Sequence, residues 1–379
     1  MEQNKVYRIG VDMRMAGEGF GIGKYALDLF SALLKRKNDF KYVLFFDKNF
    51  NSGEYEKFKN LGADCRLVSA KYYSFGEQVN LPRILNQENL DLVHFPNFNV
   101  PVLYRKKFVT TIHDLIHHRF PGNKKKNFLY RLAYRFIIWR AAQSAKKVIA
   151  VSKSTKSDII KLLGTKAEKV EVVYEGVSNI YRRGVGYNQI ESVKTKLGIV
   201  KPYFLFVGVC RRYKNLEFLA EAFAKWSRKI GNKYQLVLAG AVDKNYPEVA
   251  KRVHNLLNPQ ILIAPGKVSD EDLSALYSGS DGFINPSLSE GFGLPYLEAQ
   301  SSKTPVICSD IPVAREILGN SVLYFDPYNI ESLINVLDEL SNNNSLRQRL
   351  VELGMNNVSA YTWDKAAEAT ELVYKKALS

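Results

Sequence analysis

The sequence has few cysteines and no long apolar run, and both absences exclude classes of protein. Its three cysteines, Cys65, Cys210 and Cys308, lie far apart in apolar, strand-like segments. This pattern predicts buried, reduced thiols and excludes a disulfide framework or a cysteine-rich metal cluster. No stretch reaches the roughly 18 uninterrupted apolar residues that cross a bilayer. Any membrane contact is therefore expected to be peripheral.

Acidic residues are scarce relative to basic ones, with 38 Asp and Glu against 54 Lys and Arg and a formal net charge of +16. This excess favours anionic partners such as phosphorylated substrates, acidic lipids or nucleic acid, although a lysine-rich solvated surface would have the same composition. The first residues include a glutamate and no apolar run of signal-peptide length. We expect a cytoplasmic protein.

Short apolar runs alternate with helix-like segments along the chain, which is typical of parallel sheets covered by helices. A length of 379 residues with 46% hydrophobic residues favours about two domains. We expect a first series of strands at residues 7–13, 42–46, 65–69, 92–95, 108–112, 148–151 and 170–174. We expect a second series at residues 203–207, 236–239, 261–263, 282–285, 306–308 and 323–325. The clearest helical patterns are at residues 24–35, 128–142 and 363–378.

These two series predict an α/β protein of two Rossmann-like, doubly wound domains that face each other across a cleft. Such sheets bind ligands at the carboxyl ends of their strands. We expect an N-terminal domain at residues 1–182 and a C-terminal domain at residues 183–362. A last helix at residues 363–379 is expected to cross back onto the first domain.

The strongest local motif joins a strand, a loop and a helix in the second half of the chain. Glu290 lies in the loop at residues 286–293, and Glu298 lies about one turn into the helix that opens at Leu294. Carboxylates accept hydrogen bonds from paired sugar hydroxyls. An acidic residue that only stabilises a helix dipole is the structural alternative for one of the glutamates.

The glycines of the same motif are not explained by a helix dipole. They allow backbone amides to approach a phosphate or hydroxyl closely. The residues expected to bind a donor here are Gly291, Phe292, Gly293 and Leu294.

With this motif the sequence resembles the retaining glycosyltransferases of family 4, which have the two-domain GT-B fold and two glutamates separated by seven residues. Glu290 and Glu298 have that spacing. The resemblance implies that Glu290 contacts the transferred sugar and Glu298 the ribose of a nucleotide-sugar donor. It also implies that the enzyme needs neither a metal nor a cofactor, since the nucleotide sugar is a substrate.

A glycine-rich loop follows the first strand, with glycines at positions 17, 19, 21 and 23. Such strand-to-helix loops can cradle phosphates. This loop fits neither the GxxxxGK[ST] nor the GxGxxG pattern. The resemblance implies that the loop closes over the donor, with Gly21 and Gly23 as donor contacts.

His113 stands at the carboxyl end of an apolar strand, where its side chain would face the cleft. A lone histidine at such a position is often structural. The resemblance places it beside the donor sugar and makes His113, Glu290 and Lys214 the catalytic candidates. His117 and His118 follow closely, but without a matching cysteine or carboxylate constellation we expect no metal site there.

Basic residues follow the first strand of the second half, where they can neutralise donor phosphates. The resemblance transfers directly to Lys214, which precedes an asparagine. It does not choose between Arg211 and Arg212 as the second cation. Val268 lies in a segment that resembles the family loop around the nucleotide base.

Residues 124–140 interleave cations with aromatic residues at helical spacing. This segment could lie on an anionic membrane surface or stack on nucleic-acid bases. In the structural alternative, Phe128, Leu132 and Ile137 pack into the first domain while the cations face water. We expect no nucleic-acid partner.

The motifs together predict a retaining transfer of a hexose from a nucleotide sugar to a hydroxyl of a glycan or lipid-linked acceptor in surface polysaccharide synthesis. The resemblance to polysaccharide mannosyltransferases makes GDP-mannose the first donor to test, with UDP sugars and dTDP-rhamnose left open. The enzyme is expected in the cytoplasm, peripheral on the inner face of the membrane. Rival hypotheses are a nucleotide-sugar epimerase, a dinucleotide oxidoreductase and a basic nucleic-acid-binding protein.

Overall fold

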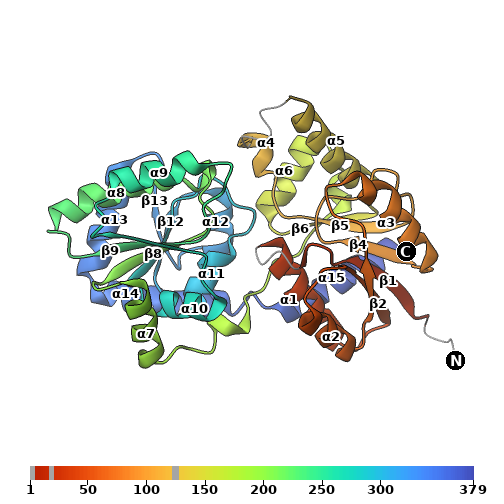
Figure 1. Ribbon diagram of the computed structural model, residues 1–379, viewed down its shortest axis with the longest axis horizontal. Coiled ribbons are helices and arrows are strands. Elements are labelled where there is room, and N and C mark those ends of the chain that lie inside the picture. The colour runs from red at the N-terminus through yellow and green to blue at the C-terminus, as the bar shows by residue number, and fades with distance from the viewer. Residues whose placement is uncertain (1–4, 17–20, 122–127) are drawn as a thin grey trace. The chain divides into compact units, whose positions relative to one another are not determined.

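The computed structural model describes residues 5–16, 21–121 and 128–379, and the chain divides into two compact units (Figure 1). The first unit takes residues 1–118, 125–176 and 363–379, and the second takes residues 119–124 and 177–362. Residues 177–182, which were expected in the first domain, therefore group with the second unit.

The first unit contains a seven-stranded parallel sheet with the strand order β3-β2-β1-β4-β5-β6-β7. Side chains alternate between its faces as the pleat requires. In β2, Leu44 and Phe46 join one apolar cluster, while Val43 and Phe45 join a second cluster on the other face. The strands are β1 (Tyr7–Asp12), β2 (Phe40–Asp47), β3 (Asp64–Val68), β4 (Leu92–Phe95), β5 (Phe108–Ile112), β6 (Lys147–Ala150) and β7 (Val170–Val172).

Helices cover both faces of this sheet, and α15 at the end of the chain packs along α1 (Figure 1). Glu371 of α15 fixes that contact, since it accepts hydrogen bonds from Arg36 and Asn38 just after α1. The helices are α1 (Ile22–Lys35), α2 (Ser52–Asn60), α3 (Phe75–Gln87), α4 (Ile116–Arg119), α5 (Phe128–Ser144), α6 (Lys153–Leu163) and α15 (Trp363–Leu378).

Helix α5 differs from the packed helix that was one alternative for this segment. Tyr134 and Ile138 are buried against the sheet, but Phe128 is 73% exposed and Leu132 is 55% exposed. Packing is thus the wrong account of Phe128 and Leu132. The helix therefore has apolar side chains on its solvent side, among arginines, as well as on its buried side.

The second unit contains a six-stranded parallel sheet with the order β10-β9-β8-β11-β12-β13. The strands are β8 (Tyr203–Val207), β9 (Gln235–Ala239), β10 (Leu262–Gly266), β11 (Gly282–Asn285), β12 (Val306–Ser309) and β13 (Leu323–Phe325). The helices are α7 (Tyr187–Leu197), α8 (Leu216–Lys229), α9 (Pro247–Leu256), α10 (Asp270–Ser278), α11 (Leu294–Ser301), α12 (Pro312–Leu318), α13 (Ile330–Asn342) and α14 (Asn344–Val358).

Both sheets are doubly wound, as the sequence predicted. In the second unit the winding reverses at β8, because β9 and β10 extend the sheet on one side while β11, β12 and β13 extend it on the other. A crevice opens at such a switch point, outside the carboxyl ends of the strands. The loops that follow β8 and β11 therefore flank the place where this fold binds ligands.

The ends of β8 and β9 approach each other closely at two glycines. A Cβ atom on Gly240 would lie 2.0 Å from the carbonyl oxygen of Gly208, and the φ angle of Gly240 is +148°. The amide of Gly240 donates to the carbonyl of Gly266 at the end of β10. A side chain at position 240 is excluded both by backbone contact and by backbone conformation.

We expect Gly240→Ala to lower the free energy of unfolding by about 2–4 kcal/mol, because strain and overpacking both add to its cost. Gly186→Ala is a matched control, since an added Cβ there meets open space at a φ angle of −71°. The control should change stability by no more than about 0.5 kcal/mol. Urea denaturation measures the stability of both variants. Equal losses of stability would show that the close contact with Gly208 does not cause the loss in Gly240→Ala.

Candidate donor site

Two of the residues singled out in the sequence meet at the switch point of the second unit. Lys214 follows β8 in a short 3-10 turn (Arg212–Lys214), and Glu290 lies in the loop after β11. The Lys214 Nζ donates to Glu290 Oε1 at 2.6 Å, and their side chains are 11% and 10% exposed. The amide of Leu288 donates to the carbonyl of Tyr213 at 2.8 Å, which ties the two loops together.

The ion pair is strengthened by a neutral neighbour. Asn285, the last residue of β11, donates through Nδ2 to the same Oε1 of Glu290 at 3.3 Å. The Lys214 ammonium also lies 5.4 Å from the centre of the Tyr213 ring, within the range of a cation–π contact. A partly buried ammonium and carboxylate are thus held ready beside the crevice, and each can exchange part of this contact for a ligand.

Glycines keep the surroundings of Lys214 open. A Cβ atom on Gly208 would lie 3.0 Å from the Phe206 ring and 3.7 Å from the Cε of Lys214. The amide of Gly208 donates to the carbonyl of Ala239 at 2.9 Å. Backbone groups therefore approach the ammonium at the carboxyl ends of β8 and β9, where side chains would block a phosphate.

The glycine-rich loop after Glu290 turns directly into α11. Gly293 caps the helix at a φ angle of +95°, and a Cβ atom there would lie 2.3 Å from the Tyr296 ring. The Phe292 side chain is buried against Tyr361, so only its backbone could meet a ligand. Leu294 and Gly291 are half-buried beside it.

Two hydroxyls near this loop are buried without a hydrogen-bond partner among the described residues. They belong to Ser287, which precedes Glu290, and to Tyr296 in the first turn of α11. Neither residue stands out in the sequence. Since orphaned buried polar groups are rare in native structures, these hydroxyls mark this loop as a place to seek ligand contacts.

Glu298 is held by a different set of contacts from Glu290. Its carboxylate is buried and accepts a hydrogen bond from the Tyr277 hydroxyl at 3.1 Å. Burial, followed by the charge of Glu298, raises the pKa of Tyr277 well above its usual value, so this phenol stays a donor. The ring of Tyr277 packs edge-on against Tyr181 and Phe283. Tyr277 was missed in the sequence because nothing local pairs it with α11.

The two arginines that the sequence could not separate have different carboxylate partners. Arg211 pairs with Asp243 at 2.9 Å and is 36% exposed, whereas Arg212 pairs with Glu248 at 3.1 Å and is 59% exposed. Burial lowers the pKa of Arg211, but Tyr213 and Asp243 outweigh it and hold the guanidinium charged. Neither arginine contacts Glu290 in a bond that the structure records. Val268 is half-buried just after β10.

The remaining candidates belong to the first unit. His113 follows β5, and its ring lies 3.1 Å from Glu175 Oε1 and 2.9 Å from the carbonyl oxygen of Pro96. Gly21 caps α1 at a φ angle of +40°. A Cβ atom on Gly23 would lie 2.9 Å from a backbone oxygen. The glycines at positions 17 and 19 lie outside the described residues.

Glu175 was also missed in the sequence, although a signal for it was present. It follows the last strand of the first series and precedes a glycine. The rule that singled out His113, a polar residue after the carboxyl end of a strand, applies equally to Glu175.

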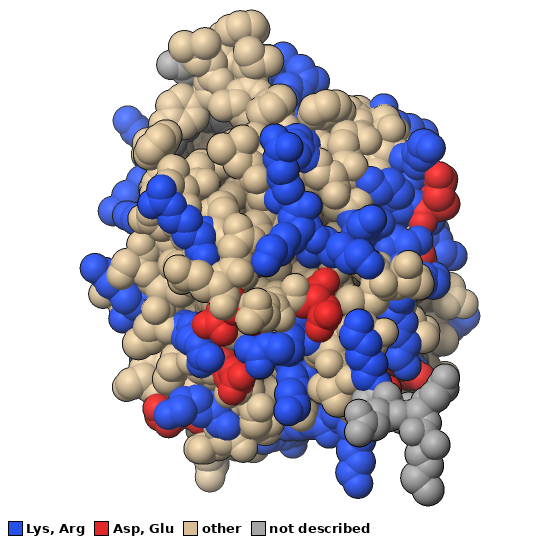
Figure 2. All heavy atoms as spheres, turned by 90° about the vertical axis from the view of Figure 1, so that its right-hand side faces the viewer, with Lys and Arg blue, Asp and Glu red and all other residues tan. Residues whose placement is uncertain are grey.

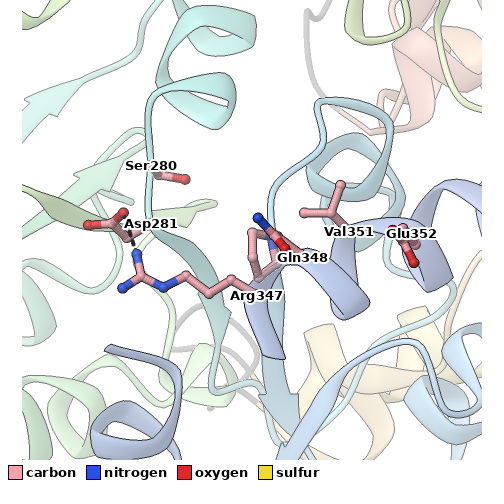
Figure 3. Close-up of a pocket in the computed structure, with 7 residues that line it drawn as sticks. Ser280, Asp281, Arg347, Gln348, Val351 and Glu352 are labelled. Atoms are coloured by element: carbon pink, nitrogen blue, oxygen red, sulfur yellow. Dashed lines mark hydrogen bonds and ion pairs between the residues drawn. The ribbon is translucent and has the colours of Figure 1, made fainter. Parts of the chain in front are cut away.

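A pocket of about 320 Å³ in the second unit does not contain these residues. It lies at the amino ends of β11 and β12, where Arg347 of α14 reaches across to Asp281 at 3.0 Å (Figure 3). Ligands of doubly wound sheets bind at the opposite, carboxyl ends. The pocket is therefore separate from the candidate donor site.

Two features are absent from the part of the chain that the structure describes. No helix there is both long and apolar enough to cross a membrane. No three His, Cys, Asp or Glu side chains gather there in a group that could hold a metal ion. The three cysteines are buried and free, as predicted.

The chain is similar in sequence to known glycosyltransferases along most of its length. The model of Glycosyltransferase Family 4 matches residues 21–179, and that of Glycosyl transferases group 1 matches residues 189–356. The O-antigen chain mannosyltransferase RfbU of Salmonella typhimurium is 27% identical over 75% of this chain and 77% of its own length. The O-antigen chain mannosyltransferase B of Escherichia coli is 26% identical over 75% of this chain and 74% of its own.

Solved structures agree in fold at lower sequence identity. Anabaena HepE in complex with UDP and glucose matches with a TM-score of 0.76 at 16% identity, over 97% of this chain and 99% of that one. Sucrose-phosphate synthase from Thermosynechococcus elongatus matches with a TM-score of 0.76 at 17% identity, over 97% and 98%. The two family models adjoin each other along the sequence, and both sheets have the doubly wound order of Rossmann-like domains. The chain is thus a glycosyltransferase of family 4 with the GT-B fold.

Proposed function

We propose that this glycosyltransferase transfers mannose from GDP-mannose, with retention of configuration, to a hydroxyl of a glycan or lipid-linked acceptor in surface polysaccharide synthesis. The observation that carries the proposal is the Lys214–Glu290 pair at the switch point of the donor-side sheet. The similarity of the chain to O-antigen mannosyltransferases supports the choice of sugar and of acceptor.

The chemistry assigns a separate task to each member of the pair. As the bond from the anomeric carbon to the diphosphate breaks, negative charge accumulates on the leaving phosphate, and the Lys214 ammonium is placed to stabilise it. Glu290 holds that ammonium in the free enzyme and can accept hydrogen bonds from sugar hydroxyls when the donor arrives. Because the ammonium is already positioned, little reorganisation is needed in the transition state.

The other steps need no protein nucleophile. The acceptor oxygen bonds to the anomeric carbon on the face that the phosphate leaves, and its proton passes to the departing phosphate. Glu298 is assigned to the ribose hydroxyls, with its carboxylate oriented by Tyr277. No metal or cofactor takes part in this scheme.

A panel of nucleotide sugars tests the assignment. GDP-mannose should support glycosidic transfer with the retained anomeric configuration, measured by NMR of the product. In thermal-shift experiments, a nucleotide at about 100 times its dissociation constant adds roughly 2.7 kcal/mol of stability. If the enzyme binds GDP more tightly than UDP, GDP should raise the melting temperature more than UDP does at the same concentration. An isomerised free sugar as product would instead favour an epimerase.

Substitution of Lys214 tests its role in stabilising the leaving group. Lys214→Met should lower kcat by about two to three orders of magnitude, because it removes a charge from the developing negative phosphate. Lys225→Met is the matched control, since Lys225 pairs with Glu221 on an exposed helix surface. Steady-state kinetics with both variants decide the matter, and a loss below about threefold for Lys214→Met would reduce Lys214 to a surface role.

Helix α5 supports a peripheral location of the enzyme on an anionic membrane. Phe136 and Trp139 are exposed, with ring centres 6.1 Å apart, and Arg131 and Arg135 are exposed on the same helix. The helix contains no acidic residue. On the first-unit face shown in Figure 2, Lys and Arg cover far more of the surface than Asp and Glu do. Aromatic residues beside arginines suit the boundary between headgroups and acyl chains.

The double variant Phe136→Ser, Trp139→Ser should bind vesicles of phosphatidylcholine and phosphatidylglycerol at least about tenfold more weakly than the wild type, since each aromatic side chain contributes roughly 1 kcal/mol or more when it inserts. Tyr187→Ser, which removes an exposed aromatic residue from the second unit, should bind as the wild type does. Sedimentation with vesicles measures both. Equal binding by wild type and double variant would show that α5 is not the membrane surface.

A further inference from the structure

The His113 ring lies between two groups that can only accept hydrogen bonds. Its Nδ1 is 3.1 Å from Glu175 Oε1, and its Nε2 is 2.9 Å from the carbonyl oxygen of Pro96. A neutral imidazole carries one N–H, so it can donate to only one of these acceptors. Both contacts are satisfied when a second proton is present, which places an imidazolium against a carboxylate.

We propose that Glu175 is a positioning residue that keeps His113 doubly protonated in the working enzyme, so that the ring acts as a fixed cation and not as a base. The protonation of His113 stands on the geometry of the first unit alone. Its consequence for catalysis rests on the proposed function and on the family resemblance, which implies that His113 contacts the donor sugar.

The ion pair between His113 and Glu175 is largely shielded from water. The side chains of His113 and Glu175 are 15% and 6% exposed. Burial by itself lowers the pKa of His113, but the hydrogen bond and the charge of Glu175, with smaller contributions from Pro96 and Asp114, outweigh burial and raise it. An ion pair shielded from water in this way is weakened less by salt than a surface pair.

Two uncharged neighbours are consistent with a cation at position 113. The Tyr25 ring of α1 stands perpendicular to the imidazole in an edge-to-face contact, with ring centres 4.6 Å apart. His94 of β4 is fully buried, with its ring nitrogens 2.7 Å from the Tyr374 hydroxyl and 2.9 Å from the Thr111 hydroxyl. Burial first, and then the charge of His113, lower the pKa of His94 to about 3, so His94 stays neutral.

The backbone of His113 is fixed as well as its ring. Its carbonyl oxygen accepts a hydrogen bond from the Thr155 hydroxyl of α6 at 3.2 Å. With both ring nitrogens donating, the imidazolium has no lone pair to take a proton from an acceptor hydroxyl. This agrees with a transfer in which the departing phosphate receives that proton.

Removal of the Glu175 charge tests the proposal. Glu175→Gln keeps an acceptor for the Nδ1–H but removes the charge, while Glu171→Gln removes a carboxylate from β7 that pairs with Lys147 and Lys376 instead. The chain has five histidines, and the His113 ring signals are identified by their loss in His113→Asn. NMR titration of the labelled full-length protein then measures the pKa of His113 in each variant.

In the wild type, His113 should titrate above the usual value of about 6.5. Glu175→Gln should lower this pKa by roughly one unit or more, as expected for loss of an adjacent opposite charge. Glu175→Asp should recover part of the shift, and Glu171→Gln should leave it unchanged. Because the pKa of His113 in the folded protein is raised, the ring stays charged up to a pH above its usual pKa. The charge is lost as the pH rises through the pKa of the folded protein.

Two results would overturn the proposal. One is a wild-type pKa at or below 6.5, which needs no variant to fold, and the other is a Glu175→Gln protein with an unchanged His113 pKa. The activity profile separates this proposal from the proposed function. If the alkaline limb of kcat moves down with the His113 pKa, His113 acts in the transfer as a cation. If the pKa falls while transfer is unaffected, the role of Glu175 stands and the catalytic role of His113 does not.

Discussion

The reversal of winding in each parallel sheet is the constraint on which the rest of this structure depends. Because β8 has β9 on one side and β11 on the other, the loops after β8 and β11 leave neighbouring strands in diverging directions. The crevice between them is where Lys214 and Glu290 meet. The same reversal occurs between β1 and β4 in the first unit. On one side of it, Pro96 after β4 is a partner of His113 after the neighbouring strand β5.

Charges near these crevices are paired before any ligand arrives. A partly buried ion pair gains Coulomb attraction but loses hydration of both partners, so it contributes little net stability. Removal of either partner, however, leaves an uncompensated charge. Charges that are already positioned also need little reorganisation during the reaction. Lys214 with Glu290 and His113 with Glu175 both follow this pattern. A third, more deeply buried group joins Arg14 with Asp12 and Glu77 just after β1, where it connects the loop after β1 to α3.

The glycines at the ends of β8 and β9 and the exposed helix α5 differ in how they present side chains to their surroundings. Gly208 and Gly240 remove side chains so that strand ends and ligands can come near. Helix α5, by contrast, presents apolar side chains to solvent on the face that does not pack against the sheet. Its apolar pattern is therefore too broad for a helix with one buried face.

The sequence by itself determined the fold class and one half of the site. Buried parallel strands are continuous apolar runs, so their positions could be read along the chain, and the motif around Glu290 and Glu298 is contiguous. Only the tertiary structure decided the partners that come from distant segments: Lys214 for Glu290, Tyr277 for Glu298 and Glu175 for His113. It also showed that Phe128 and Leu132 are exposed. Periodicity reveals that a helix face is apolar, but the packing of other elements decides whether anything covers it.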